Sequence, residues 1–218
     1  MKKQIIIFSG IFLILLFVIG GYLYKNQQAK KLGFLAQEHA EIFIRQHSPT
    51  LGSDEAKVYL VEFMDPACET CSAFAPFVKK LMADNPGKIK LVLRYAPFHD
   101  GADYFVKILE AAKKQGKYWE TLEVMYQSQP YWASHHNPQP ELIWRFLPSV
   151  SGLDLEKLST DMNDPAIGQI IAQDLADAKT LNVTKTPGFF VNGKPLATFG
   201  DIQLRQLLEA EIEVQYPR

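Results

Sequence analysis

The sequence predicts an α/β protein with an all-helical insertion, preceded by a membrane-spanning helix. Three observations predict this arrangement. Two short apolar, β-prone runs flank a helical pattern and so make a βαβ unit, the stretch 101–181 is helical in pattern throughout, and the first 25 residues contain a long uncharged run. A hairpin pattern near the C-terminus adds two more strands to the sheet.

The composition is that of an ordinary globular protein. The chain has 218 residues, of which 47% are apolar and 22% charged, so its length suits one domain with a full hydrophobic core. The formal net charge is -1, and beyond the first 25 residues acids outnumber bases by about four. Nothing in this charge balance points to nucleic-acid binding.

Residues 1–25 predict a membrane anchor. Ile5 to Tyr24 is a run of about 20 residues without a charge, long enough as a helix to cross the ~30 Å hydrocarbon core of a bilayer. A cleaved signal peptide has a shorter apolar run, and Val18-Ile19-Gly20 is a poor cleavage site. An uncleaved anchor is therefore favoured, and export with a cleaved signal is the alternative.

Residues 26–52 predict a stalk or linker helix. From Lys30 to His47, apolar residues recur at near-helical spacing among charges. This pattern is typical of a short linker helix, of a stalk packed on the following domain, or of a self-association helix. Ser48-Pro49 ends it.

The stretch Val58 to Cys71, VYLVEFMDPACETC, carries the chemistry. Val58 to Phe63 predicts a strand, Asp65-Pro66 breaks it, and a helix with one buried face follows. Cys68 then falls in the first helical turn, where unpaired backbone N–H groups and the positive end of the helix dipole favour a thiolate. We therefore expect Cys68 to be an exposed nucleophile.

Two further residues are candidates to assist Cys68. Cys71 lies one turn along the helix on its inward face, close enough to form a disulfide with Cys68 and to resolve a mixed disulfide. Glu62 lies on the preceding strand in an apolar setting, which raises the pKa of a carboxyl, so it is a candidate to exchange a proton with Cys71. Glu69 and Thr70 form the active-site dipeptide between the cysteines.

The cysteine pair has two other possible roles. It could be half of a zinc site, although the chain has no second cysteine pair and its five histidines are scattered. It could also be a structural disulfide, although a loop of four residues constrains the unfolded chain little. Redox exchange is favoured, without a metal ion or another cofactor.

The rest of the chain supplies the remaining strands and the insertion. Lys88 to Tyr95 predicts a second strand, which a right-handed crossover places parallel to the first. Helical patterns follow at Tyr104 to Lys114, Lys117 to Gln127, Pro140 to Leu147, Leu155 to Asn163 and Ala166 to Leu181. We expect the aromatic residues of this region in its core, namely Trp119, Tyr126, Tyr131, Trp132 and Trp144.

The C-terminal part predicts a hairpin and one more helix. Asn192-Gly193 between two apolar runs is a strong hairpin signal, which places an antiparallel pair at one edge of the sheet. Asp201 is expected to cap a final amphipathic helix.

Together these motifs resemble a known family. The order of Glu62, Cys68-x-x-Cys71, a helix interrupted by Pro76, and a distant Thr186-Pro187 resembles the thioredoxin fold. The stretches 48–52 (SPTLG) and 95–99 (YAPFH) resemble, more narrowly, the DsbA-type thiol oxidoreductases of bacterial envelopes. The resemblance covers roughly residues 48–213. It implies a thioredoxin-like domain at 53–98 and 183–218, with a helical domain inserted at 99–182.

The resemblance also implies roles that the spacing alone does not. Pro187 would be a cis-proline beside the active disulfide, and the backbone of Thr186 would pair with an extended substrate strand. The activity would be thiol-disulfide exchange on exported proteins. The catalytic domain would lie in the periplasm, held by a single span of the bacterial inner membrane and served by a membrane redox partner.

The direction of exchange and a competing class stay open. Glu69-Thr70 stands where strong oxidants of this type have Pro-His, and a carboxylate beside Cys68 disfavours the thiolate, so we expect an oxidant of moderate power. Thr186 before the proline also fits a disulfide reductase or isomerase. The competing class is a membrane-tethered binding module that holds Cu(I) or a client protein through the two thiolates without turnover.

Overall fold

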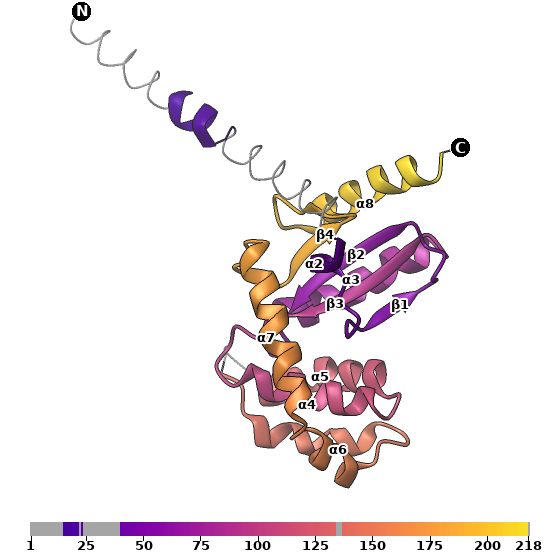
Figure 1. The fold of residues 1–218 in the computed structure, drawn as a ribbon, viewed down its shortest axis with the longest axis vertical. Helices are drawn as coiled ribbons and strands as arrows, with labels where there is room; N and C mark the ends of the chain where they lie inside the picture. The colour runs from indigo at the N-terminus through magenta and orange to yellow at the C-terminus, as the bar shows by residue number, and fades with distance from the viewer. Residues whose placement is uncertain (1–14, 22, 24–39, 134–136, 218) are drawn as a thin grey trace, which may run out of the picture.

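The computed structural model describes residues 15–21, 23, 40–133 and 137–217. Within these residues five strands form one mixed sheet in the order β1-β3-β2-β4-β5 (Figure 1). The strands are β1 (Thr50–Gly52), β2 (Val58–Met64), β3 (Ile89–Tyr95), β4 (Gly188–Val191) and β5 (Lys194–Pro195). β2 and β3 are parallel and are joined by helix α3 (Glu69–Asp84), as the βαβ pattern predicts, and the other neighbouring pairs are antiparallel.

Helices cover both faces of this sheet, because successive side chains of β2 point to opposite sides. Val58 and Leu60 pack in one buried cluster with residues of α3 and of α8 (Asp201–Gln215). Val61 and Phe63 pack in a second cluster with residues of α2 (Ala40–Phe43) and α7 (Pro165–Thr180). The sheet is therefore the middle layer of three.

The remaining helices follow β3 in the chain and gather beyond one end of the sheet (Figure 1). They are α4 (Ala102–Lys113), α5 (Tyr118–Trp132), the 3-10 segments η2 (Pro140–Arg145) and η3 (Leu147–Ser149), and α6 (Leu155–Asp161). The predicted helical character of this region is confirmed, but 140–147 is not one α-helix, since residues 140–145 form the 3-10 segment η2 and Leu147 begins η3. Trp132 is buried as expected, whereas Tyr131 is 69% exposed and stacks on Phe146, so its predicted core position is wrong.

The predicted hairpin is present between β4 and β5. Asn192 and Gly193 both have positive φ, 47° and 78°, as the tight turn requires. Asn192 Oδ1 also accepts a hydrogen bond of 2.8 Å from the backbone N–H of Tyr59 on β2. The last helix, α8, begins at Asp201 with Gly200 at its N-cap, so Asp201 is not the capping residue.

The sequence does not predict β1, whose residues it assigns to the stalk. This three-residue strand pairs antiparallel with β3 and forms one edge of the sheet. The other edge, β5, has two residues and ends in Pro195, which has no N–H to offer to a further strand. Both edges of the sheet are thus short.

A buried charge cluster joins the turn after α2 to α7 and β3. Arg94, which is 0% exposed, donates to Asp174 at 2.7 Å and to Asp177 at 2.5 Å. Arg45 binds Asp177 through two hydrogen bonds of 2.8 and 2.9 Å, and His47 Nε2 lies 2.7 Å from Asp174. The two acids on α7 therefore hold both strand β3 and the segment that leads into the sheet.

The predicted membrane segment, Ile5 to Tyr24, lies mostly outside the described residues, of which 15–21 and 23 are helical. No helix in the described part of the chain has the length and apolar character needed to cross a bilayer.

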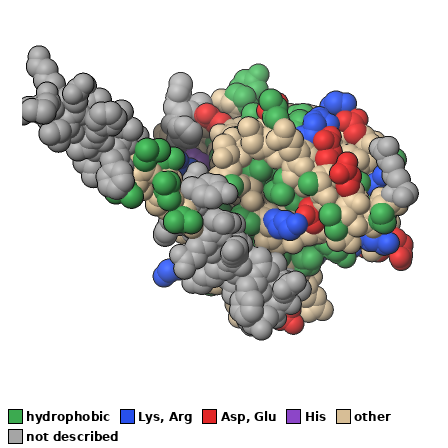
Figure 2. Space-filling model, turned by 90° about the horizontal axis from the view of Figure 1, so that it is seen from above, with side chains coloured by type: hydrophobic (Ala, Val, Ile, Leu, Met, Phe, Trp, Pro, Cys, Tyr) green, Lys and Arg blue, Asp and Glu red, His purple; other side chains and the backbone are tan. Residues whose placement is uncertain are grey.

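On the face seen in Figure 2, basic side chains lie next to acidic ones and do not gather into a basic patch.

Candidate active site

The turn between β2 and α3 is organised by Asp65, whose side chain is fully buried. Its Oδ1 accepts from the backbone N–H of Ala67 at 2.8 Å. Its Oδ2 accepts from the backbone N–H groups of Phe98 and His99 at 2.8 and 2.9 Å, and lies 2.8 Å from His99 Nδ1. Asp65 thus ties the turn before Cys68 to the loop after β3. The sequence identifies Asp65 only as a strand breaker, and its partners Phe98 and His99 lie more than 30 residues away.

Cys68 is the N-cap residue of α3, directly ahead of the first helical turn. Its side chain makes no hydrogen bond that caps the helix, but the Cys71 thiol, Thr186 and the backbone N–H groups of Cys71 and Thr70 all favour its thiolate and lower its pKa. The Cys71 contact contributes most to lowering the pKa of Cys68 from 9.0 to about 5, against the opposing effect of burial. The predicted position at a helix start is confirmed, and the sulfur there is an acidic thiol.

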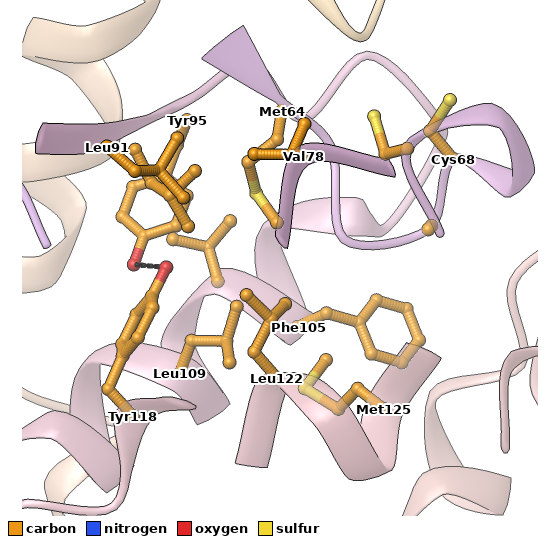
Figure 3. Close-up of a cluster of buried hydrophobic side chains, with 14 of the residues drawn as sticks. Met64, Cys68, Val78, Leu91, Tyr95, Phe105, Leu109, Tyr118, Leu122 and Met125 are labelled. Atoms are coloured by element: carbon orange, nitrogen blue, oxygen red, sulfur yellow. Dashed lines mark hydrogen bonds between the residues drawn. The ribbon is translucent and has the colours of Figure 1, made fainter. Parts of the chain in front are cut away.

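Cys68 is buried, so the prediction of an exposed nucleophile is wrong. Only 5% of the residue is accessible, and its Sγ lies 3.4 Å from the backbone carbonyl oxygen of Thr186. Figure 3 shows Cys68 at one end of the buried cluster, on the far side from the Tyr95–Tyr118 pair. The covering segment is 118 residues away in the chain, so the local pattern around Cys68 gives no sign of it.

Cys71 and Glu62 lie on the inner side of Cys68, as expected. Cys71 is 0% exposed, and burial, the Cys68 contact and the charge of Glu62 raise the pKa of its thiol well above the usual value. Glu62 is 5% exposed, and burial followed by the charge of Cys68 raises the pKa of its carboxyl to about 8. At neutral pH the structure therefore pairs one ionised thiol with a protonated thiol and a protonated carboxyl.

Two openings lie near these residues. A mostly apolar cleft of about 550 Å³ between α3 and α5 is lined by Glu62, Ser72 and Tyr126 among others. A second hollow of about 470 Å³ lies beside Pro187 and includes Phe189 and Phe199. The two openings share no lining residue.

The remaining predicted site residues lie around the cysteines. Glu69 and Thr70 are exposed in the first turn of α3. The Thr186–Pro187 peptide bond is cis, as the resemblance implies, and the loop that contains it leads into β4. The structure therefore brings all the predicted site residues to the region where β2, α3 and this loop meet.

Helix α5 supplies contacts that the sequence analysis missed. The Gln129 side-chain amide donates to the Pro66 carbonyl oxygen at 3.0 Å, and the Ser72 hydroxyl donates to the Tyr126 carbonyl oxygen at 3.2 Å. Among the described residues there is no cluster of three or more histidine, cysteine, aspartate or glutamate side chains suited to hold a metal ion.

Comparison with known proteins agrees with this geometry. Residues 45–210 match the model of the family described as thioredoxin. The chain is 25% identical over 177 residues to disulfide bond formation protein D of Bacillus subtilis, which covers 76% of this chain and 77% of that protein. It resembles the crystal structure of a thioredoxin-like oxidoreductase from Silicibacter pomeroyi with a TM-score of 0.68 and 29% identity, covering 79% of this chain and 96% of that one.

The similarity extends to part of much larger proteins. The chain is 29% identical over 145 residues to a Na(+)/H(+) antiporter, NhaA, of Herminiimonas arsenicoxydans. The match covers 66% of this chain but only 22% of the antiporter. The chain thus spans about a fifth of the length of this relative.

Proposed function

This chain belongs to the thioredoxin family, and on that premise we propose that it performs thiol-disulfide exchange on exported proteins through Cys68 and Cys71. The predicted resemblance to DsbA-like members of the family is confirmed. The observation that carries the proposal is the contrast between the two thiols. An acidic Cys68 at a helix start stands next to a buried Cys71 whose pKa is raised.

In the oxidising direction, a client thiolate attacks Cys68 Sγ of the enzyme disulfide. A mixed disulfide forms, and the Cys71 sulfur leaves as a thiolate that takes a proton from Glu62. A second client thiolate then attacks the client sulfur of the mixed disulfide. The client gains its disulfide, and Cys68 leaves as a thiolate, so the enzyme keeps the two electrons that the client has lost.

The reverse direction uses the same groups. The Cys68 thiolate attacks a client disulfide and expels one client thiolate, and Cys71 then passes its proton to the ionised fraction of Glu62 and attacks Cys68 to release the reduced client. The stabilised Cys68 thiolate favours the reduced enzyme and hence oxidation of clients. A pKa of about 5, well below the usual value but not extreme, supports moderate oxidising power over a reductase or isomerase role.

The backbone next to Pro187 is the proposed client site. The Thr186 carbonyl oxygen lies against Cys68 Sγ, and a hollow opens beside Pro187. An extended client strand paired with Thr186 would place its sulfur at Cys68 after a local displacement of this loop. Because Cys68 is only 5% exposed, client binding is coupled to this displacement.

We assign the catalytic part to the outer side of the bacterial inner membrane, with residues 1–25 as anchor and a membrane redox partner that reoxidises the pair. Thiol-disulfide exchange of this kind requires an oxidising compartment. Membrane fractionation and protease protection of the full chain test this location. Release of the protein into the soluble fraction with an intact N-terminus contradicts it.

The test of the exchange activity is a trapping experiment in cells with Cys71→Ala. Without the resolving thiol, the mixed disulfides at Cys68 persist and client proteins appear as adducts that reductant releases. Cys68→Ser is the matched control and yields none. Absence of adducts with Cys71→Ala, together with tight Cu(I) binding by the purified wild-type protein, supports the binding module instead.

A further inference from the structure

Helix α5 holds the active-site turn at two points, one on each side of the cysteines. The Gln129 side-chain amide bonds the carbonyl of Pro66, two residues before Cys68. The Ser72 hydroxyl, one residue after Cys71, bonds the carbonyl of Tyr126 on the same helix. The segment from Pro66 to Ser72 is therefore fixed to a helix that the chain reaches about 50 residues later.

Pro130 explains why the Tyr126 carbonyl is available. In a regular α-helix the N–H of residue 130 donates to the carbonyl of residue 126, and proline has no N–H. Pro130 lies inside α5, so the Tyr126 oxygen can accept the Ser72 hydroxyl instead. The proline thus turns a helix-internal acceptor toward the reactive helix.

Gln129 is an unusual residue to find at its position. It is 3% exposed, and a buried amide is costly unless its polar atoms are bonded. Its Nε2 donates to Pro66, the residue that follows the fully buried Asp65. The Gln129 side-chain amide therefore donates to the turn before Cys68 and not to solvent.

We propose that α5 is a positioning element for the redox pair. Through Gln129 and the Tyr126 carbonyl it holds the turn so that Cys68 stays at the N-cap of α3. This inference rests on the proposed function and deepens it, because it makes the helical insertion a determinant of how acidic the nucleophile is.

The expected sign follows from the surroundings of Cys68. Their net effect lowers the pKa of its thiol from 9.0 to about 5, so any loosening of the turn moves the pKa back toward the ordinary value. Loss of either contact is thus expected to make Cys68 less acidic. If the contacts had a purely structural role, their loss would lower the stability of the protein and leave the acidity of Cys68 unchanged.

The experiment measures the pH dependence of Cys68 alkylation by iodoacetamide in the reduced full chain, with thiolate ultraviolet absorbance as a second readout. Gln129→Met keeps the side-chain length and removes the donor, and Ser72→Ala removes the other contact. The matched control is Ser128→Ala on the same helix, whose hydroxyl bonds Val124, Met125 and Trp132 and not the active-site turn.

We expect Gln129→Met to move the pH midpoint of alkylation upward by at least half a unit, which is about a threefold loss of acidity. Ser72→Ala should move it in the same direction, and Ser128→Ala should leave it unchanged. Pro130→Ala is an independent variant, because it returns the helical N–H that competes for the Tyr126 carbonyl and favours helix formation. Pro130→Ala should raise the midpoint as well, and it tests the inference if Gln129→Met does not fold.

The outcomes separate this inference from the proposed function. A low midpoint in the wild type that is unchanged in folded Gln129→Met, Ser72→Ala and Pro130→Ala overturns the role of α5 alone. A wild-type midpoint near that of free cysteine overturns the proposed function itself. An upward shift in Ser128→Ala equal to that of Gln129→Met also overturns the positioning role, since the effect is then general to the helix.

Discussion

Replacing Glu62 by glutamine is expected to make the reduced protein more stable and a slower catalyst. Glutamine has the shape of the protonated carboxyl but cannot ionise. In the wild type the pKa of Glu62 is raised from 4.5 to about 8, mainly by burial. An acid whose folded-state pKa is raised contributes stability at low pH and loses it as the pH rises between the two values. Glu62→Gln removes this loss.

Each unit of pKa shift corresponds to about 1.4 kcal/mol, so the cost of ionising Glu62 approaches ~5 kcal/mol at high pH. The expected gain of Glu62→Gln is then about 1 kcal/mol at pH 5 and about 3 kcal/mol at pH 7. Cys68 has the opposite slope, because its pKa is lowered from 9.0 to about 5 and its contribution grows with pH. The two slopes nearly cancel in the reduced wild type, whose stability should be almost flat from pH 5 to 8.

Urea unfolding of the reduced wild type and of Glu62→Gln at several pH values between 5 and 8 measures these slopes. We expect a flat profile for the wild type and a rise of about 1.4 kcal/mol per pH unit for Glu62→Gln. The acids whose pKa is lowered, such as Asp54 and Asp177, titrate below this window and do not disturb it. If the two proteins differ by the same amount at pH 5 and pH 7, then Glu62 does not titrate with a raised pKa.

Three further substitutions test the groups that hold the site and the sheet. Asp65→Ala leaves its buried N–H partners without an acceptor and should lower the free energy of unfolding by ~3 kcal/mol or more, measured in urea; an effect below 1 kcal/mol would mean that water replaces the carboxylate. Arg94→Met leaves Asp174 buried without its main cation and should cost about 3–5 kcal/mol, whereas Arg45→Ala, at a partly exposed position, should cost about 1 kcal/mol or less. Equal costs for the two arginines would contradict the burial argument. Asn192→Ala should destabilise by about 1–2 kcal/mol because of its positive φ and lost side-chain bonds, and Asn192→Gly by less; the reverse order in thermal unfolding would rule out the backbone explanation.

The elements that could be predicted from the sequence are those fixed by local pattern. The apolar run of β2 followed by Asp65-Pro66 and the cysteine pair specifies a strand, a turn and a helix start, and Asn192-Gly193 specifies the hairpin, because each signal needs only neighbouring residues. β1 was missed because three residues that pair with β3 carry no periodicity of their own.

The features of the site that the sequence does not predict have the same origin. The burial of Cys68 depends on the Thr186 backbone, and the hold on its turn depends on Gln129. Arg94 sits in an apolar strand, and its acidic partners lie about 80 residues further along. Contacts of this kind join segments that no local pattern relates, so the sequence identified the reacting groups and not what surrounds them.

Under the proposed function the protein meets unfolded client chains, and the shortness of the sheet's two edges then matters. Such chains present free backbone groups that can add to any exposed strand and start an aggregate. Here β1 offers three residues and β5 two, with Pro195 ending the latter. An extended polypeptide could therefore form few backbone hydrogen bonds with either edge strand. Under the proposed function, clients then dock at the segment beside Pro187, next to the Cys68 sulfur, and the short edges limit aggregation of the protein with its clients.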